Sequence, residues 1–247
     1  MAVFVIADLH LSTADGTDKS MEVFGPRWAG YTDRLSRGWR AVVGENDTVV
    51  VAGDISWALT LPEALSDLRF LDGLPGRKIL LRGNHDYWWS TAAKMGRFCR
   101  EEGLGTLSFL HNNAHAADGM LLCGTRGWFF DAEGESRGLT EADHEKIVLR
   151  EVGRLRLSLA AADEAARAGG LPRETERVVF FHFPVVWGAG VCAPLLDVLK
   201  EHGIGRCYFG HIHGATATSF ETEGIRMTLV AADALGFLPL LVRPTDA

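Results

Sequence analysis

Side chains that bind metal ions gather in short clusters at the ends of apolar runs. The clusters are Asp8-Leu9-His10, Gly53-Asp54, Gly83-Asn84-His85-Asp86, His182 and Gly210-His211-Ile212-His213. Together they offer two carboxylates, four imidazoles and one amide carbonyl, with a fifth imidazole to spare. This set suits two divalent metals that share one carboxylate, and two metals a few ångströms apart suit the hydrolysis of phosphate esters.

The charge of this donor set also favours two metals. Two divalent ions carry four positive charges, Asp8 and Asp54 return two negative charges, and neutral imidazoles return none. A bridging hydroxide returns one more, so the site keeps a positive charge that attracts a phosphate anion. Metal binding lowers the pKa of water to about 7, which makes a bridging hydroxide a ready nucleophile.

Elements that alternate between strand and helix must position these donors. We expect strands at residues 2–7, 48–52, 78–81, 106–110, 115–117, 120–123, 178–181 and 206–209, and helices at residues 31–43, 63–71, 91–102, 140–168 and 193–202. The alternation indicates βαβ units and a largely parallel sheet. Ligands bind beyond the carboxyl ends of parallel strands, and every donor cluster follows an expected strand directly.

Two of the clusters hold donors spaced two residues apart. Asp8 and His10 would point the same way from an extended segment, and His211 and His213 repeat that spacing. The sequence therefore predicts extended backbone at both pairs.

The length and composition favour one domain, residues 1–247, with a core of ordinary size. The chain has 247 residues, of which 47% are hydrophobic and 23% charged. Residues 129–172 are expected to form a partly helical excursion near the site. Its long charged helix is interpreted as amphipathic with a solvated face, and a lid or a dimer face is the alternative.

The charge and the cysteines limit the partners and the compartment. A formal net charge of −7 disfavours extended nucleic acid, so the expected partner is a small phosphorylated substrate. No apolar run reaches the ~18 residues of a membrane span, and we expect no signal peptide before the first strand. The four cysteines form no CxxC pair, so we expect reduced, buried thiols in a cytoplasmic protein. The oligomeric state is left open.

The order of the motifs resembles the calcineurin-like metallophosphoesterase superfamily. Asp-x-His, Gly-Asp, Gly-Asn-His-Asp, His and Gly-His-x-His follow one another between residues 8 and 213. The phrases Gly-Asp-Ile-Ser-Trp and Gly-Asn-His-Asp-Tyr-Trp-Trp resemble a bacterial branch of predicted phosphohydrolases within it. The resemblance implies an α/β fold, a four-layer αββα sandwich of two mixed β-sheets flanked by helices.

The resemblance also implies roles for the donors. The implied ligand sets are Asp8, His10, Asp54 and His213 for one metal, and Asp54, Asn84, His182 and His211 for the other. His85 would be the general acid, with Asp86 orienting it. The expected function is a dinuclear-metal-dependent phosphodiesterase or phosphomonoesterase in which a metal-bridging hydroxide attacks phosphorus. Mixed nitrogen and oxygen ligands accept Mn, Fe, Zn, Co or Ni, so the metal stays open.

The substrate contacts are predicted from residues around the clusters. Arg126 is a candidate phosphate clamp because arginine donates in a bidentate fork, and a solvated loop arginine is the alternative. Trp88 and Trp187 are candidates for an aromatic rim that stacks a flat group, and loop packing is the alternative. Both tryptophans follow motif clusters closely, and Trp57 does the same.

Two other functions remain possible from the sequence. A catalytically inactive scaffold of this fold would bind a protein partner, but the retained donors and His85 speak against it. A metal-dependent amidohydrolase usually begins with a His-x-His pair, whereas this chain begins with Asp8 and His10.

Overall fold

Alternate residues of the central strands pack into two different cores. In the computed structural model, which describes residues 1–13, 19–129, 138–216 and 219–243, strand β1 (Val3–Ile6) is buried on both faces. Phe4 and Ile6 pack beneath a helical layer, whereas Val3 and Val5 face the second sheet. Because side chains alternate across a strand, this double burial requires a layer on each side.

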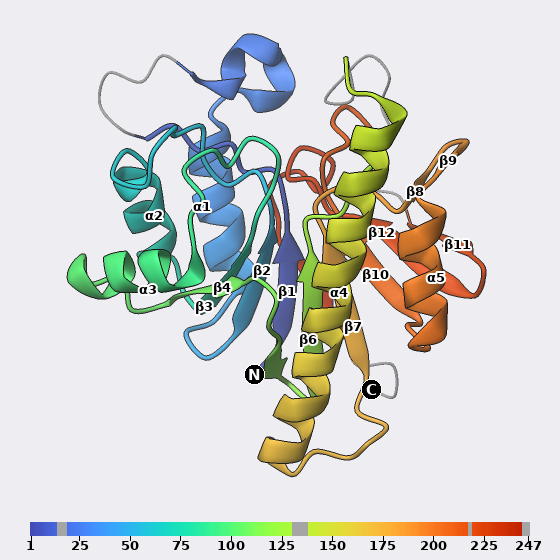
Figure 1. The fold of residues 1–247 in the computed structure, drawn as a ribbon. Helices are drawn as coiled ribbons and strands as arrows, with labels where there is room; N and C mark the ends of the chain where they lie inside the picture. Colours follow the sequence, from blue (N-terminus) through green and yellow to red (C-terminus); the bar gives the residue numbers. More distant parts are fainter. Residues whose placement is uncertain (14–18, 130–137, 217–218, 244–247) are drawn as a thin grey trace.

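The first sheet carries three of the donor clusters. Its strand order is β13-β1-β2-β3-β4, in which only β13 (Leu240–Val242) runs antiparallel to its neighbour. The other strands are β2 (Thr48–Ala52), β3 (Arg77–Leu81) and β4 (Leu107–Leu110). Helices α1 (Tyr31–Val42), α2 (Leu65–Asp72) and α3 (Ala92–Glu101) cover its outer face, on the left of Figure 1.

The second sheet carries the remaining donors. Its order is β11-β12-β10-β7-β6-β5. The strands are β5 (His115–Ala117), β6 (Met120–Thr125), β7 (Arg177–Phe181), β10 (Arg206–Phe209), β11 (Ser219–Thr222) and β12 (Ile225–Leu229). Helices α4 (Glu141–Gly169) and α5 (Ala193–Glu201) cover its outer face. The four-layer αββα sandwich is therefore confirmed.

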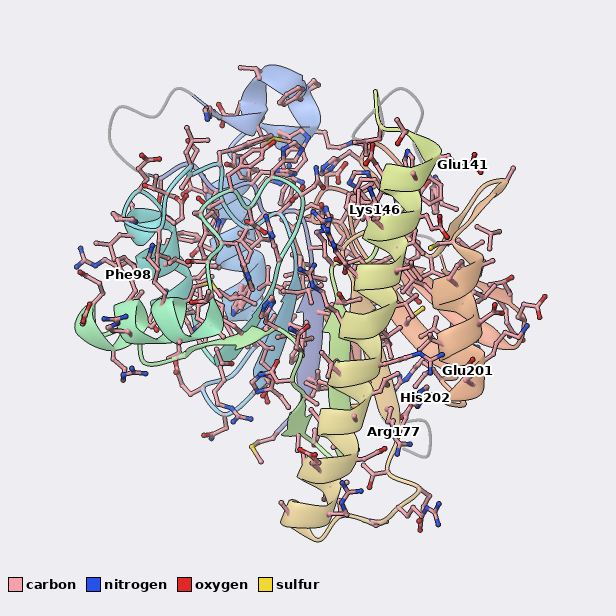
Figure 2. The ribbon with its side chains drawn as sticks, in the orientation of Figure 1. Phe98, Glu141, Lys146, Arg177, Glu201 and His202 are labelled. Atoms are coloured by element: carbon pink, nitrogen blue, oxygen red, sulfur yellow. The ribbon has the colours of Figure 1, made fainter. Side chains whose placement is uncertain are left out.

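Helix α4 is a covering layer of the second sheet. Figure 2 shows it running from Glu141 at the upper edge towards the level of Arg177 near the lower edge. Thr140 and Asp143 form the expected capping box at its start. α4 is the long helix expected within residues 129–172. It has a solvated face and a buried face, and the buried face includes Leu155 and Leu159. Residues 130–137 of the predicted excursion lie outside the described residues.

Smaller elements were not expected from the sequence. The 3₁₀ turns η1 (Met21–Phe24) and η2 (Pro26–Trp28) lie between β1 and α1, at the upper edge of Figure 1. A short hairpin, β8 (Val186–Trp187) with β9 (Gly190–Val191), follows β7. Pro62 lies in a turn before α2 and not in its first turn, because the helix begins only at Leu65.

Two further expectations concern the thiols and the membrane. All four cysteines are free and buried, which confirms that part of the prediction. No helix among the described residues is long and apolar enough to span a membrane.

Buried polar contacts fasten α4 to the end of β6. The Ser158 hydroxyl accepts the Gly124 amide at 2.9 Å and donates to the Asn113 carbonyl at 2.6 Å. The buried Glu151 carboxylate accepts the Thr125 hydroxyl at 2.5 Å and the Gly127 amide at 3.1 Å. Buried donors and acceptors are costly to leave unpaired, so these contacts fix the helix against the strand that leads into the site.

Ser158→Ala should lower the free energy of unfolding by about 1–3 kcal/mol, because it removes the partner of the buried Gly124 amide and of the partly buried Asn113 carbonyl. Urea denaturation of the wild type and the variant measures the difference. Leu157→Ala is the matched control on the same helix, since Leu157 is 56% exposed and should change stability by less than about 0.5 kcal/mol. Equal effects of the two substitutions would contradict the fastening role.

Candidate metal centre

The predicted donors meet at the carboxyl ends of both sheets. Asp8 and His10 follow β1, Asp54 follows β2 and Asn84 follows β3, all in the first sheet. Three further donors come from the second sheet: His182 after β7, and His211 and His213 after β10. Pairing of Ala7 with Ala231, beyond the end of β12, joins the two sheets beside this point.

The backbone at the paired donors is not extended, so that part of the sequence prediction is wrong. Asp8, His10 and His211 have left-handed φ angles of 58°, 44° and 70°. Hydrogen bonds between loops impose the conformation: the Asp8 amide donates to the Gly53 carbonyl and the His10 amide to the Asp54 carbonyl, each at 2.9 Å. A left-handed φ at a non-glycine residue costs about 1 kcal/mol or more, so tertiary contacts hold these donors against local preference.

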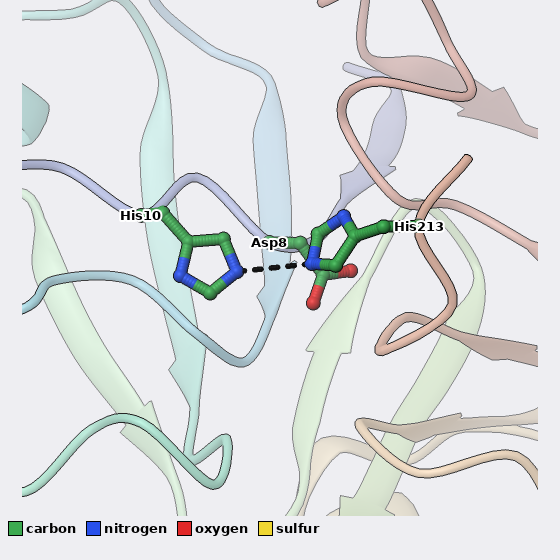
Figure 3. Close-up of side chains that lie close together, drawn as sticks. All are labelled: Asp8, His10 and His213. Carbon is green, nitrogen blue, oxygen red and sulfur yellow. Dashed lines mark hydrogen bonds between the residues drawn. The ribbon is translucent and has the colours of Figure 1, made fainter. Parts of the chain in front are cut away.

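One group of donors surrounds the side chain of His10. Its Nε2 lies 3.1 Å from Nε2 of His213, as the dashed line in Figure 3 marks, and 3.6 Å from Oδ2 of Asp54. Asp8 lies beside the same pair in Figure 3, and ligand atoms of Asp8, His10 and His213 all fall within 4.8 Å of one another. Tyr31 supports the loop by donating its hydroxyl to the His10 carbonyl at 2.8 Å.

A second group of donors surrounds His182. Its Nε2 lies 2.5 Å from Oδ1 of Asn84 and 3.5 Å from Oδ2 of Asp54. Nδ1 of His211 lies 3.2 Å from the same Asn84 oxygen. Nδ1 of His182 lies 3.2 Å from the Ala52 carbonyl, which leaves Nε2 as the nitrogen available to a metal. Oδ2 of Asp54 is close to histidines of both groups, as a bridging carboxylate requires.

Two glycines allow the loops to come this close. A Cβ at Gly83 would collide with the carboxylate and the amide of Asp54, and a Cβ at Gly210 would collide with the carboxylate of Asp8 and with Ala7. The amide of His211 donates to both Asp8 oxygens, at 3.0 and 2.9 Å, which links the loop after β1 to the loop after β10. The close approach therefore depends on the missing side chains at these two positions.

The charge states of the clustered donors suit the binding of divalent cations. Burial raises the pKa of the Asp8 carboxyl to about 7, although His213 and the His211 amide lower it in part. Burial, together with neighbouring histidines, lowers the pKa of His10 and of His182 well below the usual value, so both rings are neutral ligands near pH 7. A buried carboxylate among neutral imidazoles is stabilised by a bound cation.

Asp233 belongs to the site and was missed by the sequence analysis. Its Oδ1 lies 3.1 Å from Nδ1 of His213, while Oδ2 accepts the Gly214 amide at 2.9 Å and Arg27 at 3.0 Å. Burial alone would raise the pKa of Asp233, but these hydrogen bonds lower it to about 2. Burial lowers the pKa of His213, but its hydrogen bond with Asp233 and the charges of Asp8 and Asp233 outweigh burial and raise that pKa. The sequence signal that could have revealed Asp233 is its place directly after the apolar run at residues 229–232.

Asp86 ties the loops of the first sheet together. It accepts the Ile55, Ser56 and Gly83 amides at 2.8, 3.2 and 2.7 Å and the Trp88 indole at 3.0 Å. Trp88 is only 2% exposed and packs this loop, which favours the packing alternative; its role as a substrate contact stays a prediction. Orientation of the His85 ring by Asp86 stays a prediction.

Arg126 and Trp187 lie on the side of the second sheet. The Arg126 carbonyl accepts the His182 amide at 3.1 Å, and its guanidinium lies 5.7 Å from the centre of the Phe183 ring. The ring of Trp187 packs edge-on against Phe209, with centroids 5.8 Å apart, in agreement with the packing alternative. The phosphate-clamp role of Arg126 stays a prediction.

An αββα sandwich with aspartates and histidines at the carboxyl ends of both sheets is the architecture of a metallophosphoesterase. Residues 1–215 match the family described as calcineurin-like phosphoesterase, and the chain belongs to that family.

Comparison with known proteins supports the fold. The chain is similar to a phosphopantetheinyl hydrolase from Mycobacterium tuberculosis, at 14% identity over 98% of this chain and 96% of that one, with a TM-score of 0.55. It is also similar to the protein TT1561 of Thermus thermophilus, at 12% identity over 94% and 89%, with a TM-score of 0.57. A stretch of 52 residues is 44% identical to the gene 66 protein of Mycobacterium phage L5 and spans 25% of that protein's length.

Asp233→Asn should weaken metal binding about 10- to 100-fold, because the carboxylate holds the His213 ring in the tautomer that presents Nε2. Calorimetric titration of the metal-free protein with Mn²⁺ measures the affinity. Arg27→Gln is the control, since it removes the outer partner of the same carboxylate and should have a smaller effect. Unchanged affinity in the Asp233 variant would contradict this role.

Proposed function

We propose that the protein is a phosphoester hydrolase that uses two divalent metal ions. The observation that carries the proposal is the convergence of seven donors from five loops of two sheets, with Asp54 between the two groups. Membership of the calcineurin-like phosphoesterase family supports the same reaction class. The substrate is a small phosphorylated molecule, either a monoester or a diester.

The seven donors form two proposed ligand sets. One metal would be held by Asp8, His10, Asp54 and His213, and the other by Asp54, Asn84, His182 and His211. When bound, the two ions supply Lewis acidity to the phosphate and to the attacking water. The protein supplies neutral imidazoles, a bridging carboxylate and the buried surroundings that strengthen every charge interaction in the site.

His85 is the proposed proton donor to the departing alcohol. Its amide donates to Oδ1 of Asp54 at 2.8 Å, which fixes its position relative to the donors. The ring lies 5.6 Å from the ring of His10, measured between centroids, and borders an open cleft. Its side chain would thus lie next to the reacting phosphate and outside the two proposed ligand sets, as a general acid must.

Purified protein should contain two divalent metals per chain, and chelation should abolish turnover of phosphate esters. The reason is that the ions contribute several kcal/mol of transition-state stabilisation. Elemental analysis, combined with assays of aryl phosphate monoesters and diesters after reloading with Mn, Fe, Zn, Co or Ni, measures both. Asp54→Asn should lose both metals. A wild-type protein that binds two metals and hydrolyses neither ester class would favour the inactive, partner-binding alternative.

His85→Ala should reduce kcat by about 10²–10⁴-fold while both metals remain bound, since a general acid acts on the leaving group and not on the ions. Steady-state kinetics and elemental analysis of the same sample test this. His202→Ala serves as the control, because His202 caps the C-terminal end of α5, at its lower end in Figure 2, and is not among the donors. Loss of metal from the His85 variant would mean that the role is misassigned.

A further inference from the structure

An aromatic cleft opens beside His85 and is not explained by the metal donors. Its volume is about 510 Å³, and His10, His85 and His213 form one wall. The aromatic wall of the cleft is built by the 3₁₀ turns η1 and η2 together with the loop after β2, and it adjoins these histidines. The apolar residues of that wall are Met21, Phe24, Trp28 and Trp57.

We propose that this cleft binds the leaving group of the substrate and that it selects a flat aromatic group. The inference rests on the proposed hydrolase function and names the class of substrate. The hydrolysed ester would join phosphate to an alcohol that carries an aromatic ring close to the bridging oxygen.

The position of His85 decides which part of the substrate enters the cleft. In phosphoryl transfer the attacking and leaving oxygens lie on opposite sides of phosphorus. A general acid must come within hydrogen-bond reach of the oxygen that it protonates, which here is the leaving oxygen. Because His85 lines the cleft, the group attached to that oxygen lies in the cleft.

The ring geometry selects a flat group. The indole of Trp57 stacks on His10 with centroids 4.8 Å apart and lies 4.6 Å from His85. Trp28 presents its edge to His213 at 5.6 Å. Phe24 is 68% exposed at the rim, where a large apolar side chain gains nothing from the protein core. Trp28 is only 3% exposed and supports the lining from behind, so Trp57 and Phe24 are the rings that offer surface to a ligand. Aromatic surface of this kind binds a planar ring better than an aliphatic ring of the same size.

The charges of the cleft disfavour a second phosphate. Arg27 is the arginine of its lining, and its Nη1 is 3.0 Å from Oδ2 of Asp233, so the two charges largely balance. The lining therefore offers aromatic side chains to a ligand and carries no strong excess of positive charge. An uncharged aromatic group fits such a lining better than a polyphosphate chain does.

Local hydrogen bonds hold the wall in place before any ligand arrives. The Ser20 hydroxyl accepts the Glu22 amide at 3.2 Å, and the Glu22 carboxylate accepts the Gly30 amide at 2.8 Å. Arg34 donates to the Arg27 carbonyl at 2.7 Å. A preformed wall loses less entropy on binding than a flexible one, which is expected of a specificity site.

The test compares two ligand pairs that differ in the flatness of one ring. Benzylphosphonate and cyclohexylmethylphosphonate are titrated calorimetrically into the Mn²⁺-loaded protein, and benzyl and cyclohexylmethyl phosphate are compared as substrates. The two leaving alcohols are both primary and similar in size, so leaving-group acidity does not dominate the comparison. We expect the benzyl compound to be favoured by about 10-fold in affinity and in kcat/KM.

Substitutions in the wall locate the preference. Phe24→Ala and Trp57→Leu should each lower the benzyl preference by about 3- to 10-fold through affinity and KM. Val23→Ala is the matched control, because Val23 is 78% exposed on the same 3₁₀ turn and does not line the cleft; it should leave the preference unchanged. Metal content is measured for each variant, which separates ring stacking from disturbance of His10.

Failure of this inference is distinct from failure of the proposed function. Turnover of both esters without a benzyl preference, or a preference that survives Phe24→Ala and Trp57→Leu, overturns the aromatic subsite and keeps the hydrolase. Selective binding of benzylphosphonate without turnover of any ester keeps the subsite and overturns the hydrolase. Binding of neither phosphonate also overturns the subsite.

Discussion

Two carboxylates and four imidazoles are packed together where the sheets meet, and the rest of the structure depends on keeping them there. Protein groups alone do not balance this cluster, because burial raises the pKa of Asp8 to about 7 and keeps His10 and His182 neutral. A bound cation offsets the free-energy cost of burying carboxylates and imidazoles together. The close packing of the donors therefore fits the proposed metal site, in which a bound cation would offset this cost.

The two sheets provide the rigidity that the cluster needs. Donors at the carboxyl ends of buried strands are fixed by cores on both faces, and loop-to-loop hydrogen bonds then set their backbone in left-handed conformations. Positions 83 and 210 are glycines, and any larger residue there would have a side chain that keeps the loops apart. Asp86 and Asp233 complete the arrangement by accepting hydrogen bonds from the loops and from a donor ring.

The sequence predicted the strands and helices well because their patterns are local. The five-residue apolar run of β2 and the capping box of α4 each report on their own segment, and the structure has both at the expected residues. The same local reasoning failed at Asp8 and His10, where extended backbone was expected. Their φ angles are set by hydrogen bonds to the loop after β2, more than 40 residues away, which no local pattern contains.

The sequence by itself determined the type and order of the proposed donors, because both are contained in short motifs. Only the tertiary structure decided what surrounds them. Arg27 and Asp233 are 206 residues apart and pair through contacts that form when the sheets close on each other. The same packing buries Trp88, brings Trp28 and Trp57 against His10 and leaves the cleft beside His85. The proposed substrate preference therefore depends on the packed loops and not on the motifs.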